Sequence, residues 1–181
     1  MLAQLGDLHI KSNVVSTLGG VYIQQGKIEE ALPYLEKALT RSEQMEDTAG
    51  MSQDSLNLAE AYIQGHDLLT ALDLLESALP LARAASDKRC EGFILQNMGR
   101  VYDVDDAEQA ATYYEQALML FGETKDQYGK ALTSCIFGAL RARQGEIGEA
   151  SMLLQAGVAY LREIGHADAE KYAALLQQLQ Q

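Results

Sequence analysis

Cysteine, proline and long apolar runs are all scarce in this chain of 181 residues. Two cysteines, Cys90 and Cys135, are too few to cross-link a fold and lack a C-x-x-C spacing. We interpret them as reduced, mostly buried thiols, with a disulfide as the alternative. Only two prolines and a hydrophobic content of 48% argue against disorder. No apolar run approaches the roughly 18 residues that span a membrane, so we expect a soluble, cytoplasmic protein.

Basic residues are also in deficit, since 14 Lys and Arg stand against 26 Asp and Glu for a net charge of -12. Phosphate contacts need clustered Lys and Arg, so we expect no nucleic acid partner. A basic or neutral peptide is compatible with this charge, and a solvated acidic surface explains it equally well.

Groups that carry catalysis are sparse. His9, His66 and His166 have no spaced carboxylate or cysteine that would complete a nucleophile or a metal set, and we interpret them as surface residues. The sequence has no Gly-rich phosphate loop and no paired acids in a predicted pocket. We therefore expect no enzyme activity, no metal and no cofactor.

An internal repeat of about 40 residues is what the sequence does contain. A small residue recurs at spacings of 39 or 40, and so does an alanine a little further on; these slots are Gly19, Ala59, Gly99 and Gly138, and Ala31, Ala71, Ala110 and Ala150. Such self-similarity is typical of stacked repeat proteins. We expect the small residues to let neighbouring helices approach closely, and Tyr22, Tyr62 and Tyr102 to fill the gaps between helices.

These residues resemble the tetratricopeptide repeat, a helix-turn-helix unit, over nearly the whole chain. The period exceeds the usual 34 residues, so the chain is similar to the long-helix variety of kinesin light chains, spindle-orientation adaptors and the sensor regions of bacterial regulators. The resemblance implies an all-α fold, a right-handed α-α superhelix of four helix pairs plus a C-terminal capping helix. The sequence departs from the family pattern at Arg141, where Tyr is expected, and at Gly157, where Ala is expected.

The domain prediction is a single solenoid over residues 1–181, in which the repeats cover about 8–46, 47–86, 87–125 and 126–165 and the cap helix covers 166–181. We interpret residues 1–6 as the end of a preceding helix. We therefore expect a fragment of a longer protein, and an uncapped first helix can promote end-to-end self-association.

Capping residues set the expected helix ends. Helices are predicted over about 8–25, 28–45, 48–64, 68–85, 127–144, 148–164 and 167–180. Aspartates at the helix starts should accept backbone hydrogen bonds, and Gly26 should close the first helix in the left-handed conformation. The acidic turn 103–108 lacks the Gly and the ligand spacing of a calcium loop. We predict instead a solvated turn in which Asp106 caps the next helix and Gln109 completes a capping box.

In this family the first helices of the repeats line a concave surface, and the resemblance carries those positions onto this chain. The predicted peptide-binding groove consists of Asn13, Thr17, Gln53, Leu56, Asn57, Glu60, Ile63, Phe93, Gln96, Asn97, Arg100, Asp103, Leu132 and Cys135. Asn57 and Asn97 occupy a slot at which an amide can hold the backbone of an extended peptide. The alternatives are that these Asn residues bond an adjacent helix, and that Arg100 pairs internally instead of receiving a peptide carboxylate.

We predict a protein-protein interaction scaffold that binds a peptide or partner segment in this groove. The alternative is an effector-sensing module of a bacterial signalling or transcription regulator, which binds a small molecule or a signalling peptide. Chaperone-tail binding is not expected, because no groove position carries Lys.

Overall fold

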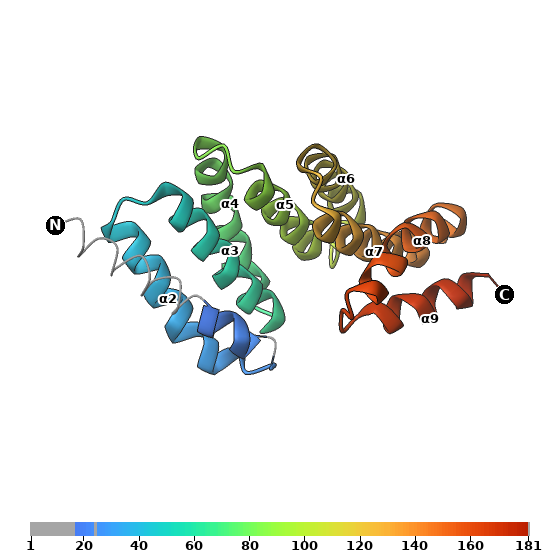
Figure 1. Cartoon of the computed structure of the whole chain (residues 1–181), viewed down its shortest axis with the longest axis horizontal. Helices are drawn as coiled ribbons and strands as arrows, with labels where there is room; N and C mark the ends of the chain where they lie inside the picture. The colour runs from blue at the N-terminus through green and yellow to red at the C-terminus, as the bar shows by residue number, and fades with distance from the viewer. Residues whose placement is uncertain (1–16, 24, 181) are drawn as a thin grey trace. The chain divides into compact units, whose positions relative to one another are not determined.

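A computed structural model describes residues 17–23 and 25–180, and every regular element within them is a helix (Figure 1). Residues 17–23 are helical, and the helices after them are α2 (Ile28–Gln44), α3 (Thr48–Gln64), α4 (Leu68–Ala84), α5 (Lys88–Tyr102), α6 (Ala107–Thr124), α7 (Gln127–Arg143), α8 (Ile147–Glu163) and α9 (Ala169–Leu179). The predicted helix ends agree closely with these bounds, and the all-α fold class is confirmed. The predicted helix over 8–25 falls partly outside the described residues.

The chain divides into two compact units, Met1–Asn97 and Met98–Gln181, which we call unit 1 and unit 2. The division falls inside α5. In unit 1, α3 packs on both α2 and α4; in unit 2, α7 packs on α6 and α8, and α9 packs on α8 and α7. Among the described residues, no helix has the length and apolar character needed to cross a membrane.

Aspartate side chains cap the starts of five helices, α3 to α7, as predicted. Each accepts a hydrogen bond from the backbone N–H three residues on: Asp47 from Gly50 at 2.9 Å, Asp67 from Thr70 at 3.2 Å, Asp87 from Cys90 at 2.9 Å, Asp106 from Gln109 at 3.0 Å and Asp126 from Gly129 at 2.8 Å. These bonds satisfy donors that have no partner inside the helix.

Only one of the two hydrogen bonds of the predicted capping box forms. Asp106 caps the helix, but the Gln109 side chain does not bond back to the Asp106 backbone N–H. The backbone N–H of Asp106 already donates to the Tyr102 carbonyl at 2.8 Å, so it needs no bond from a side chain. Gln109 Nε2 lies instead 3.5 Å from the Tyr113 hydroxyl.

A residue in the left-handed region ends most of the helices. Gly26 has a φ of +71°, as predicted. Four turns place a side-chain-bearing residue in the same conformation: Glu46, His66, Ser86 and Lys125, with φ of 53°, 63°, 56° and 56°. This conformation costs an L-residue roughly 1–2 kcal/mol, so these turns carry local strain that glycine would relieve.

Small residues of the repeat lie where two helices touch. A Cβ added to Gly19 would lie 2.5 Å from Leu35 Cδ2, and one added to Gly138 would lie 2.9 Å from Leu154 Cγ. The alanine slot is fully buried in every repeat: Ala31, Ala71, Ala110 and Ala150 are each 0% exposed. The prediction that these residues permit close helix approach is confirmed.

The family pattern leads us to expect Ala at position 157, and the structure gives a steric reason for the glycine found there. A Cβ at this position would lie 2.5 Å from the Cys135 sulfur of α7 and in contact with the Ala131 carbonyl. The Ala131 carbonyl oxygen and the Cys135 sulfur together take the volume that an alanine Cβ would occupy, so only glycine fits.

Helix α9 begins at Ala169 rather than at the predicted 167. Its Ala169 and Tyr172 are buried against α7 and α8, and Leu175, Leu176 and Leu179 pack partly buried on the same core. Arg162 of α8 donates two hydrogen bonds of 2.9 Å to Glu170 of α9.

Candidate functional site

The exposed face of α3 in unit 1 carries a row of polar side chains. Gln53 is exposed and its Nε2 donates to Asn57 Oδ1 at 3.0 Å. Asn57 and Glu60, each about one turn further along, are partly exposed. Since successive members lie four or three residues apart, they share one side of the helix.

The first turn of α5 lies beside the start of α3, because Ser52 Oγ and Cys90 Sγ are 3.6 Å apart. In the slot equivalent to Asn57, Asn97 donates through Nδ2 to the Phe93 carbonyl of its own helix at 3.1 Å. Asn97 is 4% exposed and its neighbour Gln96 is 3% exposed. The two Asn residues of the predicted peptide slot therefore differ, since Asn57 reaches the surface and Asn97 is nearly covered.

Apolar members of the predicted groove in unit 1 are mostly part of the core. Leu56 and Ile63 are 5% and 8% exposed, so they offer little surface to a ligand. Phe93 is partly exposed, and the Arg89 guanidinium lies 5.1 Å from the centre of its ring. Thr17 is exposed, and Asn13 lies outside the described residues.

The predicted groove residues of unit 2 have three different environments. Arg100 and Leu132 are partly exposed. Asp103 pairs with Arg143, forty residues away in the sequence. Cys135 is 0% exposed, and burial raises the pKa of its thiol to about 12. Because Cys135 is enclosed by the core, its predicted role as an exposed groove residue is corrected: the thiol cannot contact a ligand on the surface.

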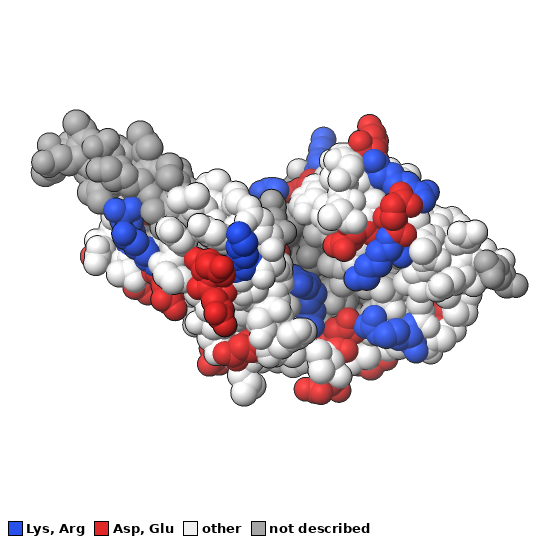
Figure 2. Space-filling view, turned by 90° about the horizontal axis from the view of Figure 1, so that it is seen from below, with Lys and Arg blue, Asp and Glu red and all other residues white. Residues whose placement is uncertain are grey.

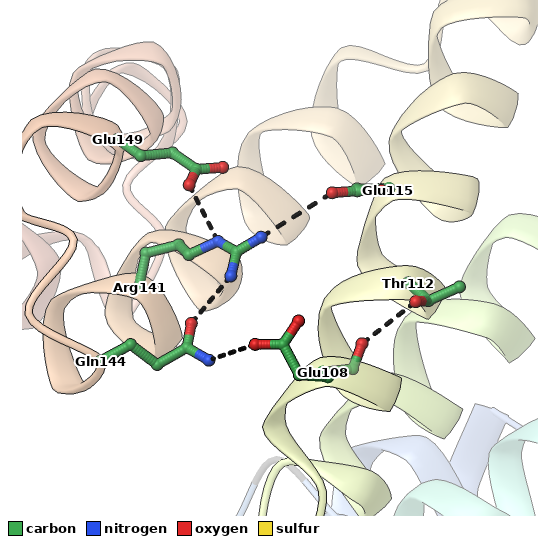
Figure 3. A network of polar contacts seen from close by, with 6 residues as sticks. All are labelled: Glu108, Thr112, Glu115, Arg141, Gln144 and Glu149. Carbon is green, nitrogen blue, oxygen red and sulfur yellow. Dashed lines mark hydrogen bonds and ion pairs between the residues drawn. The ribbon is translucent and has the colours of Figure 1, made fainter.

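The sequence prediction missed a polar network around Arg141, the residue that replaces the expected Tyr. Figure 3 shows the guanidinium between helices α6 and α8, with an ion pair of 3.0 Å to Glu149 and a longer one of 3.8 Å to Glu115. Nη1 donates to Gln144 Oε1 at 2.9 Å, and the guanidinium carbon lies 4.8 Å from the centre of the Phe137 ring.

The side chain of Arg141 is only 15% exposed, so its charge is largely removed from water and needs these partners. The tyrosines in this slot stack instead, Tyr22 on Tyr34 and Tyr102 on Tyr113 at 5.5 and 5.4 Å. Arginine therefore fills the same gap between helices by ion pairing and by stacking on Phe137. The signal for this network in the sequence is the departure from Tyr at position 141.

Metal-ligating side chains do not gather in the part of the chain that the structure describes. No group of three or more His, Cys, Asp and Glu side chains among the described residues could hold a metal ion. His66 is exposed, His166 lies partly exposed beside the Tyr128 ring, and His9 falls outside the described range. On the face drawn in Figure 2, acidic and basic side chains intermingle within each unit.

Tetratricopeptide repeat family models match residues 15–45 and 51–123, which together make up more than half of the chain. The chain belongs to the tetratricopeptide repeat family. This confirms the resemblance inferred from the small and aromatic slots. A comparison with curated protein sequences gives no match.

Solved structures of the same fold support this assignment. A Rap protein complexed with Competence and Sporulation Factor has a TM-score of 0.81 and 19% identity over 92% of this chain and 47% of that one. BtubC (BKLC) from P. vanneervenii has a TM-score of 0.73 and 18% identity over 91% of this chain and 70% of that one. A signal transduction ATPase (STAND) protein from Pyrococcus horikoshii carries a tetratricopeptide repeat sensor. It has a TM-score of 0.69 and 20% identity over 91% of this chain and 26% of that one.

These likenesses establish the fold, and the chain spans less than half the length of the Rap and STAND proteins. The family and its structural neighbours support a protein-interaction or sensing module in general. Tetratricopeptide repeat scaffolds are generally not enzymes.

Proposed function

We propose that this protein is a binding scaffold, and that unit 1 holds an extended peptide segment on the polar face of α3 beside α5. The observation that carries the proposal is the amide row on α3, in which the exposed Gln53 is bonded to the partly exposed Asn57. An amide both donates and accepts, as does each peptide unit of a bound main chain. A strand-like ligand on this face would exchange the Gln53 bond for bonds to its own backbone.

Side chains around the amide row give the surface a mixed character. Glu60 adds a negative charge one turn beyond Asn57, and the partly exposed ring of Phe93 offers an apolar contact on α5. This favours a segment that carries a basic residue and an apolar residue. The net charge of -12 acts in the same direction.

The test is selection of binding segments from a random peptide library displayed on phage, followed by titration of one selected peptide. Replacing Gln53 and Asn57 together by Ala should weaken binding at least about tenfold, because two hydrogen-bonding groups are lost. The matched control is Gln44→Ala, which removes an exposed amide from α2 of the same unit. Equal affinity for both variants would show that the peptide binds elsewhere.

The alternative is an effector-sensing module, and two likenesses favour it. The STAND protein with the similar fold carries a tetratricopeptide repeat sensor, and the Rap protein is complexed with a factor. A thermal-shift screen of metabolites separates the two functions. A metabolite that raises the melting temperature in a saturable manner supports sensing, whereas a peptide that does so supports the scaffold.

A further inference from the structure

His166 joins the start of α9 to α7 through both nitrogens of its ring. The backbone N–H of Asp168 donates to Nδ1 at 3.2 Å, and Nε2 lies 3.5 Å from the Tyr128 hydroxyl of α7. The rings of Tyr128 and His166 are tilted against each other, with their centres 5.9 Å apart. We call the contacts of His166 with Asp168 and Tyr128 the His166 tie.

The contact with Asp168 requires one protonation state of the imidazole. A backbone N–H can only donate, so Nδ1 must be the nitrogen that carries no proton. In a neutral imidazole the other nitrogen carries the proton, and Nε2 is then the donor toward the Tyr128 hydroxyl. The His166 tie therefore uses the neutral ring at both of its nitrogens.

The start of α9 depends on this imidazole. Helices α3 to α7 each begin with an aspartate side chain that accepts a backbone N–H. Within the described residues, the Asp168 side chain makes no such bond to the first turn of α9. Nδ1 of His166 is instead the side-chain acceptor for a backbone N–H at this helix start.

Helix α9 covers part of the core of unit 2. Ala169 and Tyr172 belong to the buried cluster that includes Cys135 of α7 and Val158 and Leu161 of α8. The helix has 11 residues, a length at which an isolated helix is marginal in water. Its position therefore depends on this packing and on the contacts at its ends, and losing one of those contacts favours local opening.

Charged and titratable groups lie at the helix ends near the tie on α7, α8 and α9. They are Asp126 and Tyr128 on α7, Arg162 and Glu163 on α8, and Asp168 and Glu170 at α9. Arg162 and Glu170 pair with each other at 2.9 Å, so their charges largely cancel. Asp126 caps α7, and Glu163 is exposed to water, which screens its charge. Asp168 favours proton uptake by His166, and this attraction persists on opening because the two residues share one turn.

We propose that protonation of His166 releases α9, so that the His166 tie is a pH-sensitive switch in unit 2. An imidazolium carries a proton on both nitrogens and cannot accept from the Asp168 N–H. The packed helix therefore favours the neutral ring and the released helix the protonated one, so release increases as the pH falls through the range of about 8 to 5 in which histidine changes charge. Release uncovers apolar side chains of α7 and α8. The switch is independent of the peptide face proposed for unit 1.

Hydrogen exchange of the full chain, followed by mass spectrometry at about pH 7.5 and pH 5.5, tests the switch. Protection is the measured exchange rate relative to that of an unstructured chain at the same pH, so the pH dependence of exchange itself cancels. Between these pH values the protection of α9 should fall about tenfold, as expected for the loss of one hydrogen bond. The protection of α4 in unit 1 should stay unchanged and serves as the internal reference.

Two substitutions imitate the two states of the ring. His166→Gln keeps a neutral acceptor and should hold α9 protected at both pH values, whereas His166→Lys offers only donors and should leave α9 weakly protected at both. The matched control is His66→Gln, which removes an exposed histidine from unit 1 and should leave the acid response of α9 as in the wild type. Circular dichroism checks that each variant is folded.

Three results would overturn the proposal: equal protection of α9 at the two pH values in the wild type, an acid response that persists in His166→Gln, or full protection of α9 in His166→Lys. Failure of the peptide face is distinguishable, because this test involves no peptide. Replacing Gln53 and Asn57 by Ala should not change the acid response of α9.

Discussion

Gly99 of α5 lies directly over the ring of Tyr114 in α6, so closely that a Cβ on Gly99 would be 2.6 Å from Cε1 of the tyrosine. The other repeats place a leucine opposite the small slot, as Leu35 opposite Gly19 and Leu154 opposite Gly138. The tyrosine therefore brings a larger ring into a junction that tolerates it only because the facing residue has no side chain.

Gly99→Ala should destabilise the protein by about 1–3 kcal/mol, because the ring cannot move away inside a packed core. The double variant Gly99→Ala with Tyr114→Leu should recover much of this loss, since the second repeat carries Ala59 and Leu75, both fully buried, at the equivalent positions. Urea unfolding of the single and double variants gives the coupling free energy. Additive losses would show that the two positions do not share this contact.

Ser86→Gly should stabilise the protein by about 0.5–1 kcal/mol, because glycine adopts the left-handed conformation of this turn without strain. Ser86 has a φ of 56° and is exposed, so no packing is lost. The matched control is Ser77→Gly at an exposed position inside α4, which should cost up to about 1 kcal/mol. Thermal unfolding measures both; a destabilised Ser86→Gly variant would contradict the prediction.

Arg141→Gln should destabilise the protein by about 1–3 kcal/mol, because the ion pairs to Glu149 and Glu115 are lost within a mostly buried gap. Arg162→Gln, which removes an exposed pair, should change the free energy of unfolding by at most about 1 kcal/mol. Chemical denaturation compares the two variants. Similar losses in both would mean that the network around Arg141 contributes no more than a surface pair.

The free energy of unfolding should fall as the pH rises above about 10, the ordinary pKa of tyrosine. Burial, with the nearby charge of Asp168, raises the pKa of Tyr172 to about 12. Between these values the unfolded chain loses the proton and the folded chain keeps it, so stability decreases with pH, by at most about 1.4 kcal/mol per pH unit for this group.

Tyr172→Phe should therefore flatten the alkaline part of the stability curve between about pH 10 and 12. The buried Cys135 thiol adds a loss that already begins near pH 9, and this loss remains in the variant. Urea unfolding at a series of pH values gives both slopes. Identical slopes for the wild type and Tyr172→Phe would contradict the prediction.

Much of the fold could be predicted because its determinants are local and periodic. The caps at Asp47, Asp67, Asp87 and Asp126, and the left-handed Gly26, depend on a few neighbouring residues, and the structure confirms them. The candidate site was predicted less well. The register of the repeat places Gln53, Asn57, Phe93 and Cys135 on first helices, but it treats the exposed Gln53 and the fully buried Cys135 alike.

By itself the sequence determined the family, the repeat period, the helix ends and the small residues at the helix junctions, because each depends on short-range geometry that every copy repeats. Only the tertiary structure decided which groove positions reach the surface, why Gly157 replaces alanine, and that Arg143 pairs with Asp103 one repeat away. Burial and ion pairing depend on which side chains of other helices occupy the same volume. That choice differs from repeat to repeat, even where the backbone does not.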